Sequence, residues 1–157
     1  MKIAKIVIPL SLLPLIGMFV AVHYNSFEMP PEGSGYIGVI AYLAYLFVMW
    51  ITYLPMLIFI PFGIALLICE LCLFVTQGKF AALTAALVLM CILLLAVAVM
   101  AAYAYVVLYA FMWQTAVIML ACAEFYLAAL VAMIVGYALE CKKRRQLRKL
   151  KAAAQSV

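Results

Sequence analysis

Long apolar runs, separated by short polar breaks, make up most of this chain. The runs cover residues 3–23, 36–77, 80–112 and 115–140. An apolar run of about 20 residues can satisfy its backbone hydrogen bonds in lipid only as a helix, and at about 1.5 Å per residue it spans about 30 Å of hydrocarbon. The pattern therefore predicts an all-α protein, a polytopic bundle of transmembrane helices.

The second run is too long for one upright crossing. Residues 36–77 would extend about 63 Å as a single helix, roughly twice what a bilayer needs. Pro55 and Pro61 interrupt the run. Trp50 and Tyr53 precede the first proline, as aromatic residues do at a membrane interface. The chain either turns near Pro55 and crosses twice, or crosses once as a proline-broken helix.

Positive charge at the two ends of the chain helps to choose between these topologies. Lys2 and Lys5 lie at the N-terminal end of the first run, and dense positive charge next to a span resists translocation. Four crossings put both termini and all ten Lys and Arg on the inside, so we rank this topology first. Five crossings fit the segment lengths better but leave Lys2 and Lys5 outside, and six would need turns where no turn residues stand. Seven basic residues follow the last run: Lys142, Lys143, Arg144, Arg145, Arg148, Lys149 and Lys151.

Composition supports the membrane assignment. Hydrophobic residues make up 73% of the 157 positions and charged residues 10%, against about 25% charged in a typical globular domain. We expect a transmembrane helical domain over residues 1–141 and a basic cytoplasmic tail over residues 142–157. The first run exceeds the h-region of about 7–15 residues in a signal peptide, so we expect an uncleaved signal anchor.

The net charge of +5 comes from the tail, so it does not indicate nucleic-acid binding. We expect the tail to lie against anionic lipid headgroups or to dock a partner. The expected location is a bacterial inner (plasma) membrane, with the C-terminus in the cytoplasm.

Two carboxylates lie within apolar runs, Glu70 and Glu124. Each costs about 2.5–3.5 kcal/mol or more at the centre of a span, so such residues usually face a cavity, a partner or each other. Steps of seven align Glu70 with Gly63 and Gln77.

Steps of four align Glu124 with Ala128, Ala132 and Gly136, small residues that let two membrane helices approach closely. We therefore expect both acids to point into a protein interior. They could bind a proton or a cation there. Alternatively, they hold helices together through hydrogen bonds, with Gln77, Gln114 or Tyr126 as partners.

Other chemistry has little support in the sequence. Cys69 and Cys72 form a C-x-x-C pair, but inside an apolar helix and beside a carboxylate, where a thiolate is not stabilised. The odd count of five cysteines gives no disulfide framework, and His23 is the sole histidine. The chain has no aspartate and no phosphate-binding glycine-rich loop. We expect no catalytic site, no metal site and no cofactor.

Aromatic residues are spread over the predicted spans, and they could line a cage for an organic cation near the glutamates. Interface belts and core packing explain most of them. A short multi-span chain with an intramembrane glutamate and aromatics resembles, in composition, small proton-coupled drug exporters. The residues concerned are Tyr36, Tyr42, Tyr45, Trp50, Tyr53, Tyr103, Tyr105, Tyr109, Trp113 and Tyr126.

Three functions from different classes follow from this pattern. The first is an accessory or assembly subunit of a larger membrane complex or homo-oligomer. The second is an oligomeric ion or proton pore, or a proton-coupled carrier, of the holin, immunity or defence type, built on Glu70 and Glu124. The third is an anchor that docks lipid or a partner through the basic tail.

Overall fold

The structure is a computed structural model that describes residues 2–24, 36–76, 79–109 and 113–155. In these ranges the chain is helical, with no strand. The helices are α1 (Lys2–Tyr24), α2 (Tyr36–Val75), α3 (Phe80–Tyr103) and α5 (Trp113–Gln155), with a π-helical segment η1 (Ala104–Leu108) that continues α3. Four helical units are long and apolar enough to cross a membrane. The predicted all-α bundle of four crossings is confirmed, and the protein is an integral membrane protein.

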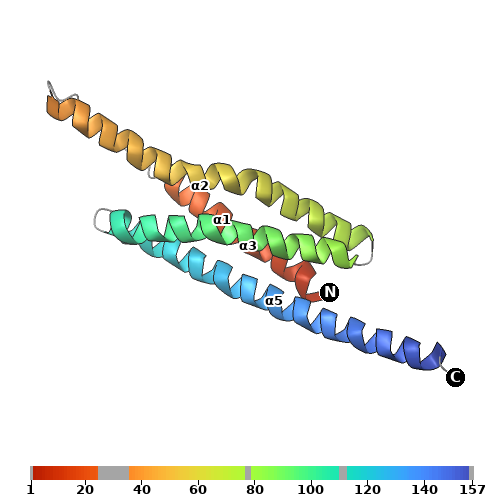
Figure 1. The fold of residues 1–157 in the computed structure, drawn as a ribbon. Helices are drawn as coiled ribbons and strands as arrows, with labels where there is room; N and C mark the ends of the chain where they lie inside the picture. The colour runs from red at the N-terminus through yellow and green to blue at the C-terminus, as the bar shows by residue number, and fades with distance from the viewer. Residues whose placement is uncertain (1, 25–35, 77–78, 110–112, 156–157) are drawn as a thin grey trace.

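Each helix runs antiparallel to the next, so the start of α1 and the end of α5 lie at the same end of the bundle (Figure 1). α2 packs on α1 and α3, and α5 packs on the same two helices from the other side. Within the described residues α2 and α5 make no contact with each other. The four helices therefore form a diamond in cross-section, with α1 and α3 on the short diagonal and α2 and α5 at the far corners.

Two glycines fix the spacing between α1 and α5. A Cβ at Gly17 of α1 would lie 3.4 Å from the Cys122 sulfur of α5, and a Cβ at Gly136 of α5 would lie 3.5 Å from Ile3 Cγ2 of α1. The two contacts are separated by the same number of residues on each helix, as an antiparallel pair requires. Absence of a side chain lets the backbones approach closely, which is how membrane helices gain packing energy without a hydrophobic driving force.

The core consists of apolar side chains at alternating intervals of three and four residues. On α5 this buried line includes Met119, Ala123, Tyr126, Leu130 and Met133. A spacing of about 3.5 residues keeps a line of side chains facing one neighbour when helices pack at a small left-handed crossing angle.

Pro55 and Pro61 lie inside α2 without ending it. Proline removes a backbone donor and crowds the preceding turn, but transmembrane helices tolerate it where neighbouring groups satisfy the freed carbonyl. The run of residues 36–77 thus crosses once, as the charge distribution predicted, in one continuous helix instead of two pieces. Its last helical residue is Val75, and Gln77 lies outside the described residues.

Exposed aromatic side chains mark one level of the bundle. Trp50 of α2, Tyr105 of η1 and Trp113 of α5 are 69%, 69% and 63% exposed. The α2–α3 pair is antiparallel, with Met56 beside Met100, so Trp50 and Tyr105 lie at similar heights. Tryptophan and tyrosine are enriched at membrane interfaces, and this level is where we place the interface remote from the basic residues.

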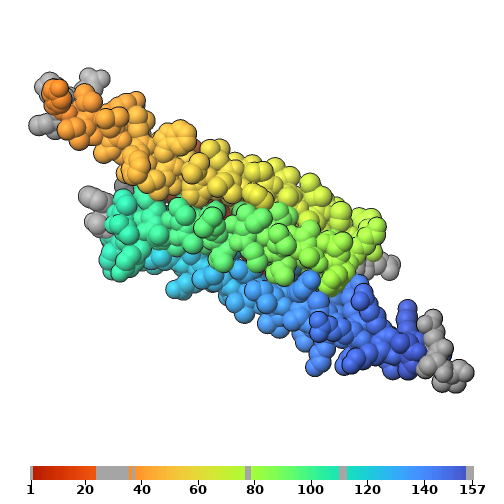
Figure 2. Space-filling view, in the orientation of Figure 1, coloured from red at the N-terminus to blue at the C-terminus, as the bar shows by residue number. Residues whose placement is uncertain are grey.

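α2 extends beyond this aromatic level. The start of α2 projects past the other helices (Figures 1 and 2). Residues 36–49 precede Trp50 and make about 21 Å of helix. They carry no charged side chain, and Tyr36 is 89% exposed. This first stretch of α2, residues 36–49, is called the apolar overhang below.

α5 extends beyond the bundle at the opposite end (Figure 1). The helix passes through Glu140 and the basic residues without a break and ends at Gln155. α5 therefore continues past residue 142, where the basic tail is expected to begin, and it begins at Trp113, two residues before the predicted span. The third run is helical as far as Tyr109, and residues 110–112 of the predicted run lie outside the described residues. One overhang is thus apolar and the other basic, at opposite ends of the molecule.

Candidate functional site

Glu124 lies on the outer face of α5, at about half the height of the bundle. Its side chain is exposed. Two residues further on, the Tyr126 hydroxyl meets the backbone of Met90, which lies near the middle of the continuous α3–η1 helix. The expectation that Glu124 points into the interior of its own bundle is wrong.

Helix geometry explains this error. A step of four residues turns about 400° around an α-helix, so a line drawn in fours drifts by about 40° per step. Extended backwards in steps of four, the line through Glu124 is buried at Ala116, is exposed at Glu124 and Ala128, and is half-buried again at Ala132. The residues that stay buried follow the 3.5-residue spacing of Met119 to Met133 instead.

A second line with the same 3.5-residue spacing runs along the exposed face of α5. It is offset by two residues, about 200°, from the buried line, and so lies opposite the core. Every member is exposed, and apart from Gln114 and Glu124 every member is Val or Ala. This outer seam consists of Gln114, Val117, Ala121, Glu124, Ala128, Val131, Val135 and Ala138.

Glu70 is not brought together with Glu124. It is half-buried on α2, little more than one turn before the helix ends, whereas Glu124 lies on α5 at the opposite corner of the bundle. The Lys5 ammonium lies 4.9 Å from the centre of the Phe74 ring, one turn after Glu70. Within the described parts of the chain, neither glutamate forms a hydrogen bond or an ion pair. A two-glutamate site does not exist within one copy.

The other polar residues proposed as partners also lie apart from the glutamates. Tyr126 is fully buried, and its hydroxyl donates a hydrogen bond of 2.8 Å to the Met90 carbonyl oxygen on α3. Gln114 is exposed near the start of α5. It is the first residue of the outer seam and lies ten residues before Glu124. Gln77 lies outside the described residues.

The small residues proposed for helix packing divide into two groups. Gly63 is buried, and a Cβ there would lie 3.3 Å from the Phe59 ring and 3.8 Å from Leu12 of α1. Gly136 faces α1, and Ala132 is half-buried against the core. Ala128 is exposed on the outer seam. The first three pack within the chain, and Ala128 does not.

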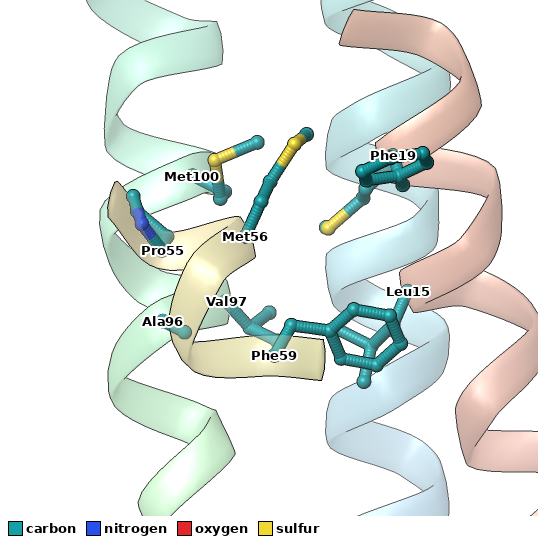
Figure 3. A pocket seen from close by; sticks show the side chains of 9 residues that line it. Leu15, Phe19, Pro55, Met56, Phe59, Ala96, Val97 and Met100 are labelled. Carbon is teal, nitrogen blue, oxygen red and sulfur yellow. The ribbon is translucent and has the colours of Figure 1, made fainter. Parts of the chain in front are cut away.

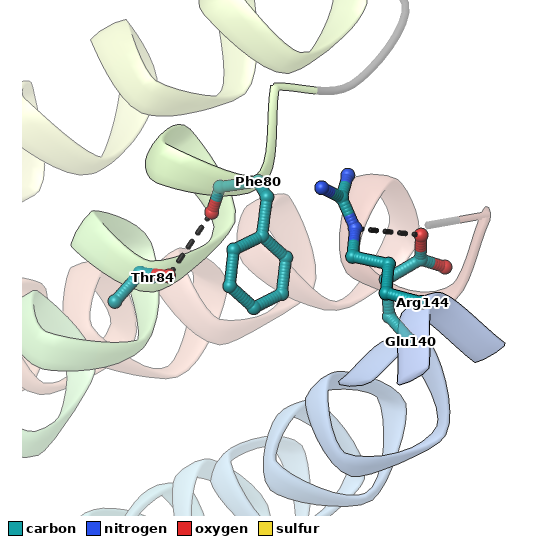
Figure 4. Close-up of polar contacts among 4 residues, drawn as sticks. All are labelled: Phe80, Thr84, Glu140 and Arg144. Carbon is teal, nitrogen blue, oxygen red and sulfur yellow. Dashed lines mark hydrogen bonds and ion pairs between the residues drawn. The ribbon is translucent and has the colours of Figure 1, made fainter. Parts of the chain in front are cut away.

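One arginine of the basic tail is held in place (Figure 4). Arg144 Nε donates to Glu140 Oε1 at 3.4 Å, one turn earlier on α5. The guanidinium carbon of Arg144 lies 4.5 Å from the centre of the Phe80 ring of α3, and Phe80 stacks on Tyr137 with ring centres 5.2 Å apart. Phe80 is not among the site residues predicted from the sequence, although an aromatic residue directly after Lys79 at the start of a span is typical of an interface position.

The interior between α1, α2 and α3 contains a small apolar cavity beside Pro55 (Figure 3). Its volume is about 20 Å³, and its lining includes Leu15, Phe59 and Met100. This volume admits about one water molecule, which would find no polar partner in such a lining. The cavity is too small for an organic substrate. Exposed Tyr36 and Trp50 do not line it, so they form no cage around it.

The five cysteines are free thiols. Cys69 is half-buried and Cys72 is exposed, both on α2. In the described ranges no three His, Cys, Asp or Glu side chains lie close enough together to hold a metal ion.

Comparisons of the chain with models of protein families, with curated proteins and with solved structures find no match.

Proposed function

We propose that this protein is an assembly subunit of a bacterial inner-membrane complex, and that it joins its partners through the outer seam of α5. Glu124 carries the proposal. A carboxyl group that faces acyl chains at half the height of a span costs about 2.5–3.5 kcal/mol or more. A neighbouring helix that hydrogen-bonds this group removes most of that cost.

The residues around Glu124 suit such a neighbour. Ala121 lies one turn before Glu124 along the seam and Ala128 one turn after it, and both are exposed. Small residues let a second helix come close enough for side chains to hydrogen-bond across the contact. The 3.5-residue spacing of the seam is that of left-handed helix pairs.

The apolar overhang of α2 supports the same proposal. Residues 36–49 lie beyond the aromatic level and expose apolar side chains such as Ile40 and Phe47. A bilayer with about 30 Å of hydrocarbon that covers the bundle does not reach this stretch. Large exposed apolar surfaces of this kind mark protein interaction sites.

For orientation, we propose that both termini and all ten Lys and Arg lie in the cytoplasm. Lys2, Lys5, Lys79 and the tail all belong to the same end of the bundle, and Trp50 and Trp113 belong to the other. Basic residues are enriched on the cytoplasmic side of membrane proteins.

The mass of the full-length protein, extracted in mild detergent from its native membrane, tests the assembly role. We expect a particle larger than the 17.4 kDa chain with bound detergent, containing further copies or other subunits in fixed ratio. Ala128→Leu, which fills the seam, should reduce the fraction of assembled particle at least about fivefold. Ala85→Leu is the matched control, because Ala85 is exposed on α3 away from the seam. A monodisperse single chain, or an equal effect of both substitutions, would contradict the proposal.

The exposed position of Glu124 also supports a second candidate, an oligomeric proton or ion pore. If several copies meet at their seams, the Glu124 carboxyl groups gather at one height around a common axis. Glu124→Gln should then abolish proton flux into liposomes while the particle mass stays the same. Unchanged flux in that variant, or no flux in the wild type, would remove this candidate and leave assembly.

A further inference from the structure

We propose that a recess between the start of α3 and the basic end of α5 binds the phosphate group of an anionic phospholipid. The recess has a volume of about 150 Å³. It is called the arginine recess below, and it is lined by Phe80, Cys141, Arg144, Arg145 and Arg148. This inference does not depend on what the outer seam binds.

Helix geometry explains why the charges converge. Arg144 and Arg145 lie three and four residues after Cys141, and Arg148 lies four and three residues after them, so all four share one face of α5. Three guanidinium groups on one face repel each other, and Glu140, which pairs with Arg144, carries one negative charge against their three positive charges. An anion in the recess would offset the remaining positive charge.

The ion pair leaves Arg144 suited to bind phosphate. Glu140 accepts from Nε, and the two terminal nitrogens of the guanidinium point away from Glu140 (Figure 4). They make no hydrogen bond to another described residue. A guanidinium presents its donors in a planar fork that matches two phosphate oxygens, which a lysine ammonium cannot do.

Phe80 and Tyr137 give the recess a rigid wall. The Arg144 guanidinium lies against the face of the Phe80 ring, and Tyr137 supports that ring from α5. A cation on an aromatic face is attracted by the ring quadrupole. This contact holds the guanidinium in one position before a ligand arrives, which lowers the entropy lost on binding.

The position of the recess favours a lipid over a soluble anion. α3 begins at Phe80, directly after Lys79, and α3 itself contains no charged residue. The recess therefore lies where the apolar helices end, at the height of the phosphate groups of a bilayer. Its volume is about ten times the roughly 15 Å³ that admits one water molecule. A phosphate bound here leaves the acyl chains beside the apolar surfaces of α3 and α5.

The test measures lipid binding to the full-length protein in neutral detergent micelles, by native mass spectrometry and by the shift of the unfolding temperature. The probes are phosphatidylglycerol, phosphatidylcholine and inorganic phosphate. We compare the wild type with Arg144→Gln/Arg145→Gln/Arg148→Gln. The matched control is Lys142→Gln/Lys143→Gln/Lys149→Gln, which removes the same charge from positions that do not line the recess.

We expect the wild type to bind phosphatidylglycerol at least about tenfold more tightly than phosphatidylcholine. The arginine variant should lose at least about tenfold in affinity for phosphatidylglycerol, and the lysine variant less than about threefold. A basic surface without a built site attracts anionic lipid through each Lys or Arg alike. Equal losses in the two variants would therefore overturn the proposal, and so would Arg-dependent binding of inorganic phosphate as strong as that of the lipid.

A second pair of variants keeps the full basic charge, in case the triple substitution prevents folding. Phe80→Leu should weaken phosphatidylglycerol binding about threefold to tenfold, because the guanidinium loses its aromatic support. Phe74→Leu is the control, since Phe74 also lies under a cation, Lys5, but on α2 and outside the recess. Equal binding by Phe80→Leu and the wild type would show that the ring does not organise the site and would overturn the proposal.

Discussion

The Tyr126 hydroxyl donates a hydrogen bond of 2.8 Å to the backbone carbonyl oxygen of Met90, and so joins α5 to α3 inside the core. Met90 and Tyr126 are both fully buried. A phenol at this position must find a partner within the protein, because no water reaches it. The contact fixes which turn of α5 faces which turn of α3.

Removal of this hydroxyl should lower stability modestly. Tyr126→Phe keeps the ring and loses the hydrogen bond, and interhelical hydrogen bonds in membrane proteins contribute about 0.6 kcal/mol on average and up to about 1.7. We expect a decrease of about 0.5–1.5 kcal/mol in the free energy of unfolding, measured in mixed micelles by denaturant titration. Tyr137→Phe should change stability less, since the contact of Tyr137 with Phe80 is between rings. A larger loss for Tyr137→Phe would contradict this assignment.

Gly136 should tolerate one methyl group and no more. A Cβ there would lie 3.5 Å from Ile3 Cγ2, an ordinary contact, so Gly136→Ala should be neutral or stabilise the helix by up to about 1 kcal/mol. Gly136→Leu has to push α1 away from α5 and should cost about 1–3 kcal/mol. Unfolding temperatures of the two variants check the prediction, and equal temperatures would show that α1 does not pack against Gly136.

Glu124 should contribute nothing to the stability of a single copy. Its carboxyl group contacts no polar group in the described ranges, so Glu124→Leu should leave the unfolding free energy of the dissociated chain unchanged within about 0.5 kcal/mol. The same substitution should reduce assembly at least about tenfold, whereas Glu124→Gln, which still hydrogen-bonds, should reduce it less. Sedimentation in density-matched micelles measures both. A variant that loses stability without losing assembly would place the role of Glu124 inside the bundle.

Labelling of single cysteines should place Lys2 and Cys141 on the same side of the membrane. In a background without other cysteines, an impermeant maleimide should react with Lys2→Cys and with Cys141 in inverted vesicles only. Trp113→Cys, at the aromatic level, should react from the other side. If Lys2→Cys reacts from the same side as Trp113→Cys, the chain crosses five times in the membrane.

Charge along the sequence ranked four crossings first, because that number places Lys2, Lys5 and the tail on one side, and the four helices confirm it. The sequence did not predict that Pro55 lies within a continuous helix. Whether a proline ends a membrane helix depends on groups that neighbouring helices supply, and these are known only once the helices are packed.

The direction in which Glu124 points also could not be predicted. The small residues Ala128, Ala132 and Gly136 lie in steps of four from Glu124 and suggested a buried face. The face of α5 that packs into the core is set by its large apolar residues instead, here Met119, Tyr126 and Met133. Likewise, the contact of Phe80 with Arg144 joins positions far apart in sequence, and helix periodicity carries no information about it.

α5 has one further mechanical property. Between Glu124 and Arg148 the helix contains no proline and no break, and its one glycine, Gly136, is held against α1. The chain therefore has no hinge along this length. If a neighbouring helix binds the outer seam and tilts or rotates α5, the arginines move with the seam as one rigid body. Binding at the seam and the position of the basic end of α5 are therefore coupled.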